Sequence, residues 1–305
     1  MNFNKGVPES LCWLNGETMP VTQARISVLD HGLLYGDGVF EGIRFYQGRA
    51  FRLQEHLLRL SDSAAAIGLP LPLDQEALAA AVAELIEAFS APEGYLRLVV
   101  TRGEGPLGLD PTPCKRGNVF IIAAQMALVD AEKCRRGIRV IIAATRRLPV
   151  DGLDPRIKSL NYLNHILARM EAANAGAQEA ILLNARGHVC EGSADNVFIV
   201  RHGALLTPPV SDGALDGITR RVIIALAAQA DRVCREQTLA PYDLYTADEC
   251  FLTGTGAELI PVREIDGRLL KQCPGSVFTG IQQQFHALIQ QETQKTTGTV
   301  LSVNQ

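Results

Sequence analysis

Residues 1–124 alternate short apolar runs with turn residues, a pattern typical of antiparallel strands. Asn15-Gly16 separates two short apolar runs, and Gln47-Gly48 separates two more; both arrangements predict β-hairpins. The same periodicity predicts strands over the apolar runs 40–46, 50–53, 95–101 and 119–124.

Two helices are expected among these strands. The first covers about 55–67, because Gly68 and Pro70 stop it there. The second begins at Asp74, since an aspartate side chain can accept hydrogen bonds from the free N–H groups of a first helical turn. Strands and helices together predict a small α+β domain over 1–124.

The apolar pattern weakens and becomes charged over 125–137, where we expect the linker to a second, larger domain over 138–305. The predicted strands of this domain cover 138–144, 179–183 and 188–200, and its predicted helices cover 218–230, 275–290 and a segment from Lys158 to Gly176. In that last helix the apolar residues share one side: Leu160, Leu163, Leu167 and Met170. The fold class expected from the whole pattern is α+β or α/β with two domains.

The bulk composition limits the classes of partner. The chain has 305 residues, a formal net charge of −4 and a pI near 5.9, so nothing points to nucleic acid or an anionic membrane. Seven scattered cysteines form no CxxC pair, which argues against a zinc site or a disulfide framework and for reduced thiols. The first ten residues are polar, and the apolar runs are shorter than the roughly 18 residues of a membrane helix. We therefore expect a cytoplasmic protein.

Lys158 is one of six lysines in the sequence, and it alone lies among apolar residues, at the start of a predicted helix. A lysine in such a place can lose its proton and attack a carbonyl carbon as a nucleophile. The alternative is a lysine whose alkyl chain packs on apolar neighbours while its amine reaches water.

A lysine that forms a Schiff base usually does so with pyridoxal phosphate (PLP) or with a substrate carbonyl. PLP also needs a carboxylate for its pyridine nitrogen and a cradle for its phosphate. Glu191, at an apolar strand before small residues, is the candidate carboxylate, or else a solvated glutamate at a strand end. Either the helix-opening turn 215–220 or the glycine-rich turn 253–256 could hold the phosphate, although ordinary loops use the same residues. Arg59 could add a fixed positive charge, or simply lie at the surface.

Five segments together resemble the class IV aminotransferases, the fold-type IV PLP enzymes. They are 29–44 (LDHGLLYGDGVFEGIR), the Lys158 segment, 191–198 (EGSADNVF), 217–220 (GITR) and 255–262 (TGAELIPV). They span nearly the whole chain. The family includes branched-chain amino acid aminotransferases, D-amino acid aminotransferases, R-selective amine transaminases and aminodeoxychorismate lyase.

The resemblance implies a role for each candidate. Lys158 would form the Schiff base with PLP, Tyr162 would bond the phenolic oxygen of the cofactor, and Glu191 would pair with its ring nitrogen. Leu215 would pack on the ring. The phosphate would be held by Arg59, Ile218, Thr219 and Thr255. Residues 138–305 would then be the cofactor-binding domain of a fold-type IV enzyme.

The period-two geometry of strands places substrate candidates side by side. Tyr95 and Arg97 share one strand face, and so do Phe40, Gly42 and Arg44. An active-site wall built this way offers an aromatic surface, a small gap and a cation. The alternative for Tyr95 and Arg97 is that they are ordinary strand residues.

Together with Tyr35, this wall resembles the branched-chain subgroup of the family. There Phe40 and Tyr35 would take an apolar side chain, and Arg97 would take a carboxylate. The last of the five segments would complete the substrate site with Thr255, Gly256 and Ala257.

The loop 103–109 also resembles that subgroup, in which Leu107 and Leu109 would line the pocket of a partner subunit in a homodimer or higher homo-oligomer. D-amino acid enzymes usually carry a cation in this loop; this chain has none at 105–109, although its 157–161 segment also resembles those enzymes. The expected function is transamination of leucine, isoleucine and valine with 2-oxoglutarate, by ping-pong steps through a Schiff base. The alternatives are a D-amino acid or R-amine transaminase, an aminodeoxychorismate lyase-like enzyme, or a B6-binding protein without activity.

Overall fold

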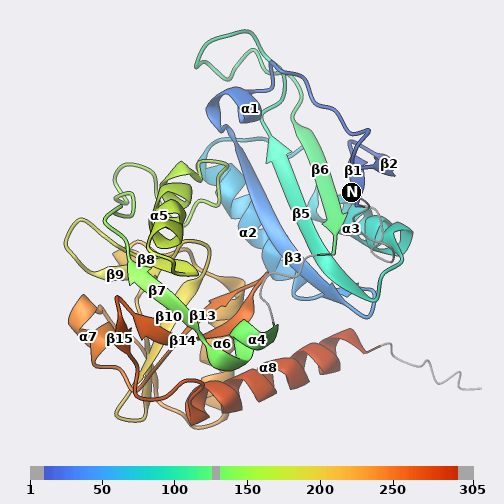
Figure 1. The fold of residues 1–305 in the computed structure, drawn as a ribbon. Helices are drawn as coiled ribbons and strands as arrows, with labels where there is room; N and C mark the ends of the chain where they lie inside the picture. Colours follow the sequence, from blue (N-terminus) through green and yellow to red (C-terminus); the bar gives the residue numbers. More distant parts are fainter. Residues whose placement is uncertain (1–9, 126–130, 295–305) are drawn as a thin grey trace, which may run out of the picture.

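The computed structural model describes residues 10–125 and 131–294, which form two sheet-centred units side by side (Figure 1). In the described residues, the first unit contains a six-stranded antiparallel sheet with the order β2-β1-β6-β5-β3-β4. Its strands are β1 (Leu11–Leu14), β2 (Glu17–Pro20), β3 (Gly38–Tyr46), β4 (Arg49–Ala50), β5 (Glu93–Thr101) and β6 (Asn118–Ala124). Both predicted hairpins are confirmed. The two turn residues of each, Asn15-Gly16 and Gln47-Gly48, have the positive φ angles that a tight hairpin turn requires.

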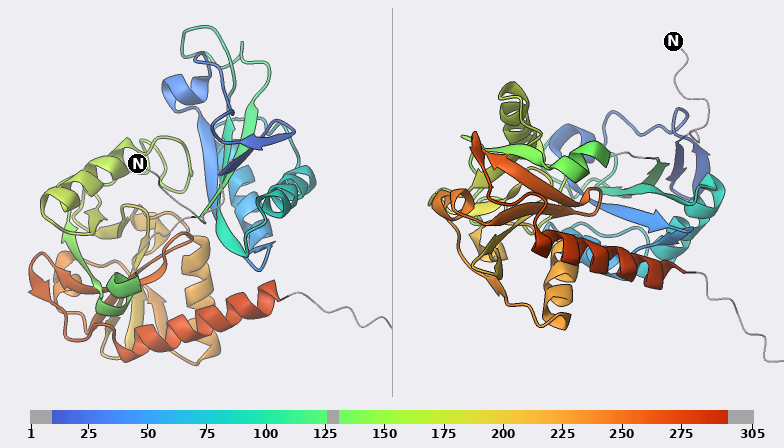
Figure 2. Two further views of the ribbon diagram at one scale, coloured as in Figure 1. Left: turned by 45° about the vertical axis from the view of Figure 1, so that its right-hand side comes forward. Right: turned by 60° about the horizontal axis from the view of Figure 1, so that its bottom comes forward.

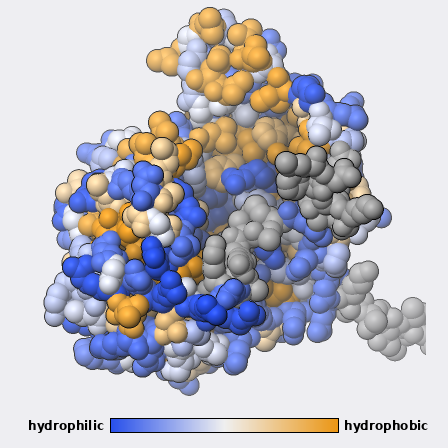
Figure 3. Space-filling model, in the orientation of Figure 1, coloured by the Kyte–Doolittle hydropathy of each residue, from blue (hydrophilic) through white to orange (hydrophobic). Residues whose placement is uncertain are grey.

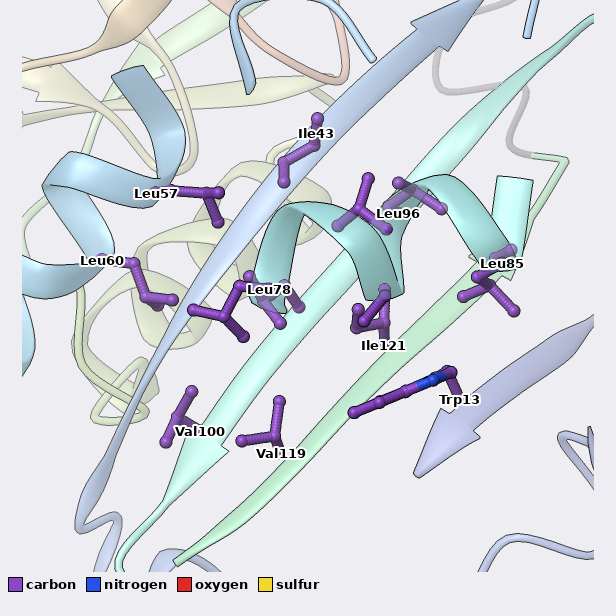
Figure 4. Packing of buried hydrophobic residues seen from close by; sticks show 14 of the residues in the cluster. Trp13, Ile43, Leu57, Leu60, Leu78, Leu85, Leu96, Val100, Val119 and Ile121 are labelled. Carbon is purple, nitrogen blue, oxygen red and sulfur yellow. The ribbon is translucent and has the colours of Figure 1, made fainter. Parts of the chain in front are cut away.

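Two helices, α2 (Leu53–Ala66) and α3 (Gln75–Phe89), cover one face of this sheet. Figure 4 shows their buried side chains, among them Leu57 and Leu78, packed against Ile43 and Ile121 of the strands. Each such leucine contributes roughly 1.5–3 kcal/mol through burial. Asp74 caps α3 as predicted, because its carboxylate accepts a hydrogen bond from the first-turn N–H of Ala77 at 2.8 Å.

Side-chain alternation along β3 gives the sheet two different faces. Val39, Ile43 and Phe45 point into the core under the helices. Phe40 and Gly42, between them, point away from the helices toward the second unit and line a cavity there. The short helix α1 (His31–Tyr35) precedes β3 at one end of the sheet.

The second unit is built on a mixed sheet with the order β12-β11-β10-β13-β14-β7-β8-β9, and β15 pairs with β14. Its strands are β7 (Ile138–Ile142), β8 (Glu179–Leu183), β9 (Val189–Gly192), β10 (Asn196–Arg201), β11 (Ala204–Thr207), β12 (Cys234–Glu236), β13 (Glu249–Gly254), β14 (Glu258–Ile265) and β15 (Arg268–Leu269). The helices are α4 (Ala131–Arg136), α5 (Leu163–Asn174), α6 (Ile218–Gln229), α7 (Pro241–Tyr245) and α8 (Ser276–Thr293), with a 3-10 turn at Val210–Asp212. Neighbouring strands are parallel only for β14–β7, β7–β8 and β11–β12 among the described pairs.

The helix expected to begin at Lys158 begins instead at Leu163. The chain before it is extended and lies against β3: the Phe40 N–H donates to the Lys158 carbonyl at 3.0 Å, and the Leu160 N–H donates to the Gly38 carbonyl at 2.9 Å. Since these backbone groups are used between segments, they cannot form a helical turn. Lys158 therefore lies on a short edge of the first sheet.

Two other expectations need correction. The strand expected over 188–200 is two strands, because the chain bends at 193–195 and passes from the neighbour of β8 to the neighbour of β13. The linker expected over 125–137 contains the helix α4. Residues 126–130 of this linker lie outside the described residues, so the domain boundary there stays a prediction.

Helix α8 connects the two units. It packs on α6 and β13 and extends past the second sheet to the first unit (Figure 2). There the ring of Phe285 meets that of Phe51 at 5.9 Å, and Arg52 forms an ion pair with Glu292 at 2.6 Å. Among the described residues, no helix has the length and apolar character needed to span a membrane.

Candidate active site

A cavity of about 890 Å³ lies between the outward face of the first sheet and the second unit. Most of the site residues predicted from the sequence line it: Phe40, Gly42, Arg59, Tyr95, Arg97, Lys158, Tyr162, Glu191, Leu215, Ile218, Thr219, Thr255, Gly256 and Ala257. They come from both units, so the cavity exists only where the two are in contact.

Four predicted substrate residues do not line this cavity. The phenol of Tyr35, expected beside Phe40, instead accepts a hydrogen bond from the Gly108 N–H at 3.0 Å, at the far end of the first unit. Leu107 and Leu109 in the same loop are 75% and 83% exposed. Arg44 donates to the Gly256 carbonyl at 3.3 Å and lies 3.6 Å from Glu258, so it supports the turn after β13 rather than opening into the cavity.

Lys158 is one of the residues that line the cavity. Its backbone N–H donates to the hydroxyl of Ser63 at 3.1 Å, which fixes the residue against α2. Its Nζ lies 3.1 Å from the Tyr162 hydroxyl and 4.6 Å from the centre of the Phe40 ring. The amine is therefore aimed into the cavity beside a phenol and above an aromatic face, where it can reach a bound carbonyl.

Glu191, on β9, is buried at the cavity and held from two sides. Oε1 accepts from Arg147 Nε at 2.8 Å, and Oε2 accepts from the Leu215 N–H at 2.8 Å. Burial raises the pKa of the Glu191 carboxyl, but neighbouring His165, the Arg147 charge and the Leu215 N–H lower it by more. The carboxyl is therefore ionised at neutral pH and suits a protonated ring nitrogen.

Another part of the cavity suits a phosphate group. Ile218 and Thr219 begin α6, so their N–H groups have no acceptor within the helix and attract an anion. The Oγ1 of Thr253 is buried at the cavity with no hydrogen-bond partner in the described part of the chain. Arg59 adds a guanidinium, and its Nη1 donates to the Asp216 carbonyl of the same turn at 2.8 Å. This donor set and the ionised Glu191 fit a phosphorylated pyridine such as PLP.

Arg59 is held by Glu41, a fully buried residue of β3 that the sequence reasoning did not single out. The carboxylate accepts from Arg59 Nε at 2.7 Å and Nη2 at 2.8 Å, and it lies 2.7 Å from His56 Nδ1. Burial raises the pKa of Glu41, but Arg59 and His56 lower it by more, to about 2. The cation at the phosphate end is therefore fixed by a charged partner.

The opposite wall of the cavity belongs to the first sheet. The Arg97 guanidinium lies over the Phe40 ring at 4.4 Å and near the Tyr95 ring at 5.7 Å. A Cβ added to Gly42 would overlap the Tyr95 hydroxyl. The wall thus combines an apolar ring, a cation and a gap filled by a phenol.

Glu41, Arg147 and His165 are site residues that were not candidates from the sequence, whereas Thr253 belongs to the turn 253–256 that was expected as a phosphate cradle. A charge at Glu41, on the strand face shared by Val39 and Ile43, could have indicated a buried partner. Arg147 lies in an irregular loop and carried no signal, because its contact with Glu191 is set by the packing of β7, β8 and β9.

Comparisons with known proteins agree with this geometry. A family model described as "Amino-transferase class IV" matches residues 38–265. The chain is 51% identical over 258 residues to a putative branched-chain-amino-acid aminotransferase of Methanocaldococcus jannaschii, a match that covers 85% of this chain and 88% of that protein.

Solved structures give the same likeness. A crystal structure of the Escherichia coli branched-chain amino acid aminotransferase is 36% identical, with a TM-score of 0.89 over 94% of this chain and 97% of that one. The branched-chain amino acid aminotransferase of Thermobaculum terrenum, solved in its PLP form, is 29% identical, with a TM-score of 0.84 over 93% of this chain and 95% of that one. The predicted fold-type IV class, with mixed helices and sheets, is confirmed by these likenesses.

Proposed function

Because this chain belongs to the class IV aminotransferases, we propose that it transfers the amino group of leucine, isoleucine or valine to 2-oxoglutarate, with PLP in the cavity between its two units. The observation that carries the proposal is Lys158 Nζ at 3.1 Å from the Tyr162 hydroxyl, in a cavity that also contains Glu191 and the start of α6. The names of the similar enzymes support the branched-chain substrates and the cofactor.

When bound, PLP supplies an electron sink that stabilises negative charge at the α-carbon of the amino acid. Lys158 is the residue we assign to bind the aldehyde and, once free, to take the α-proton on Nζ and return it. Tyr162 holds that amine by its hydroxyl. Glu191 keeps a negative charge at the ring nitrogen, with Arg147 and the Leu215 N–H holding the carboxylate in place.

The phosphate would be bound by Arg59, by the N–H groups of Ile218 and Thr219, and by Thr255. Leu215 would pack on the ring, and the unpartnered hydroxyl of Thr253 is an additional donor at this end. The helix dipole and the free N–H groups at the start of α6 would stabilise the negative charge of the phosphate here.

One site must accept an apolar side chain and a γ-carboxylate in turn, since the reaction alternates two substrates in ping-pong order. We assign the apolar side chain to Phe40, and the carboxylate to Arg97 with the Tyr95 hydroxyl, which occupies the space left by Gly42. Residues 255–257 would form the remaining side of the substrate site. Arg44 supports that turn through the Gly256 carbonyl.

A homodimer would complete the site. Tyr35 lies against the loop that carries Leu107 and Leu109, away from the cavity of its own subunit. Figure 3 shows apolar side chains gathered over this end of the first unit, and they belong to α1 and the nearby loops: Val28, Leu33, Leu34, Leu107 and Leu109. We infer that this surface lies against a second copy and brings Tyr35, Leu107 and Leu109 to the pocket of the partner.

The substrates of the proposed reaction are small molecules, an amino acid and a 2-oxo acid. We place the enzyme in the cytoplasm.

Replacement of Lys158 by alanine tests the central assignment. The Lys158→Ala protein should bind PLP without the absorbance band of the protonated Schiff base and show no steady turnover of leucine with 2-oxoglutarate. Borohydride reduction of the wild-type protein followed by peptide mapping should place the pyridoxyl group on Lys158. A label on another peptide, or turnover by the variant near the wild-type rate, would reject the assignment.

Parallel assays of L-leucine, D-alanine and R-1-phenylethylamine test the substrate class. We expect L-leucine to bleach the absorbance of bound PLP and 2-oxoglutarate to restore it. A faster response to D-alanine or to the R-amine would favour the other transaminases of this fold, and release of pyruvate without an amino acceptor would favour a lyase.

The double variant Leu107→Glu/Leu109→Glu tests the dimer. Charges on these exposed leucines should leave the fold intact but disrupt a contact between apolar surfaces. We expect light scattering after size exclusion to show a monomer, and kcat/KM for leucine to fall together with the dimer fraction. A fully active monomer of the wild-type chain at assay concentration would contradict the proposal.

A further inference from the structure

His165 joins two side chains that the proposed mechanism uses. It lies in the first turn of α5, and its ring stacks on that of Tyr162 with centroids 4.3 Å apart and an interplanar angle of 20°. On its other side, Nε2 lies 3.6 Å from Glu191 Oε1. The side chain is only 8% exposed, and Nδ1 is buried with no hydrogen-bond partner within the described ranges. An imidazole is thus enclosed at the cavity between a phenol and a carboxylate.

Tyr162 and Glu191 belong to different elements, the chain before α5 and strand β9. The proposed function assigns them to two different polar groups of one small ring, so an error in their separation would strain one of the two contacts. A residue that touches both can fix that separation before the cofactor arrives. His165 is placed to do so, because its flat ring contacts one partner by stacking and the other by its edge.

We propose that His165 is a positioning residue for the cofactor: its ring supports the Tyr162 phenol, and its Nε2–H faces Glu191, so that both side chains are held at the spacing the cofactor ring needs. The inference rests on the proposed function, since it concerns the same bound group. It assigns His165 no contact with the reacting atoms.

Several charged and titratable groups surround this pair. Arg147, in the loop after β7, donates to the same Oε1 of Glu191. Cys190 precedes Glu191 on β9, Asp195 follows the strand, and Lys158 lies beyond the Tyr162 hydroxyl. These groups are left unchanged in the test below, so a difference between variants reports on His165 alone.

Two substitutions separate the two contacts. His165→Phe keeps a flat ring against Tyr162 but removes the N–H that faces Glu191. His165→Gln keeps an N–H of similar reach but removes the stacked ring. His202→Asn, on the exposed β10–β11 turn, is the control for loss of a histidine, since asparagine tolerates the φ of 50° found there. The readouts are the melting temperature of each apo-protein and its affinity for PLP, measured by equilibrium dialysis from about pH 3.5 to 8.5, a range that extends below the ordinary glutamate pKa.

The sign of the pH effect follows from Glu191. Its neighbours lower the pKa of the carboxyl, with His165 among them, so removal of the N–H raises that pKa. Because binding needs the ionised carboxyl, the acid-side fall in affinity should begin at a higher pH in His165→Phe, while the affinity at the alkaline end stays near that of wild type. His165→Gln should lose about three- to tenfold in affinity at every pH, from the missing stacked pair. Ionisation of free PLP affects all variants alike.

The inference is wrong if both variants bind PLP as wild type does at every pH, or if only the melting temperature of the apo-protein changes. If His165→Gln does not fold, an unshifted acid limb in His165→Phe is sufficient to reject it. A wild-type protein that binds no PLP would instead reject the proposed function, and so the two failures are distinguishable.

Discussion

Arg97 is the cation that the cavity keeps available for a substrate carboxylate. Arg59 and Arg147 are each bound to a buried glutamate, whereas Arg97 has only aromatic contacts among the described residues and forms no ion pair there. Arg97→Ala should therefore lower kcat/KM for 2-oxoglutarate by about 10- to 100-fold, the range for a lost hydrogen bond to a charged group. The loss for 4-methyl-2-oxopentanoate, which has no γ-carboxylate, should be much smaller.

Arg97→Met is the matched control, because it keeps the apolar stem over Phe40 and removes only the charge. It should retain activity with the branched 2-oxo acid and lose it with 2-oxoglutarate. If kcat/KM fell equally for 2-oxoglutarate and 4-methyl-2-oxopentanoate in both variants, Arg97 would shape the wall and bind no carboxylate.

Residues with a distinctive local setting could be predicted from the sequence, and residues defined by a distant partner could not. Lys158 stood out among apolar neighbours, and Phe40, Gly42, Tyr95 and Arg97 followed from strand alternation. Arg147 could not be recognised, because its function lies in a contact with a residue 44 positions away. Tyr35 lies outside the cavity of its own subunit for the related reason that its phenol is bound by a loop 73 positions along the chain.

At the scale of elements, the facing strands β3 and β5 set the width of the substrate wall. Gly42 pairs with Arg97 in this register, and the diagonal Tyr95 phenol fills the space above the glycine. Gly42→Ala should push the phenol into the cavity and lower kcat/KM for leucine by about tenfold or more, as overpacking of roughly 1–3 kcal/mol implies. The loss for alanine, a smaller substrate, should be less.

Gly280→Ala in α8 is the control, because a Cβ there meets no atom within 4 Å. It should leave substrate preference unchanged and stabilise the protein by about 0.5–1 kcal/mol, the usual gain from removing glycine inside a helix. If kcat/KM falls by the same factor for leucine and alanine in Gly42→Ala, the strand pair has shifted as a whole and the wall does not select between substrates.

Element types were predicted well where the chain's own periodicity decides them, as in the two hairpins and in α2, α3 and α6. They failed where another segment competes for the backbone, as at 158–160, which pairs with β3 before α5 begins. The apolar side predicted for that helix includes Leu163, Leu167 and Met170, which are exposed in a single chain, while Ala168 and Ala172 face the sheet. Periodicity identified the stripe but could not say what it contacts.

At the scale of the whole molecule, the cavity depends on how firmly the two units are joined. Arg59 connects Glu41 of the first unit to the Asp216 carbonyl of the second, and α8 reaches Phe51 and Arg52. Because the cofactor end and the substrate wall belong to different units, any loosening of this junction changes the distance between them. Stability and activity should therefore decline together when the junction is weakened.

The contribution of the junction to stability can be measured as a function of pH at Glu258. Its carboxylate accepts from the Tyr46 hydroxyl at 2.7 Å and lies 3.0 Å from His286 Nε2, so it links β3, β14 and α8. Burial raises the pKa of Glu258, but the hydrogen bonds from His286 and Tyr46 and the Arg44 charge lower it overall. Its contribution to stability is therefore present above the unfolded pKa, about 4.3, and is lost as the pH falls through the lower folded value.

Glu258→Gln should lower the free energy of unfolding by about 1–3 kcal/mol at neutral pH, with a gap to wild type that narrows as the pH falls below about 4.3. The hydrogen bond to Glu258 raises the pKa of His286, so protonated His286 adds to the stability difference below its unfolded pKa of about 6.5. That contribution is lost as the pH rises through the folded pKa of His286. Urea unfolding from about pH 2.5 to 8 measures both limbs. Glu264→Gln on the same strand, whose partner Arg139 is 3.7 Å away, is the control and should change stability by less than about 0.5 kcal/mol. A gap that is the same at every pH would show that Glu258 acts through its shape and that its charge does not join the two units.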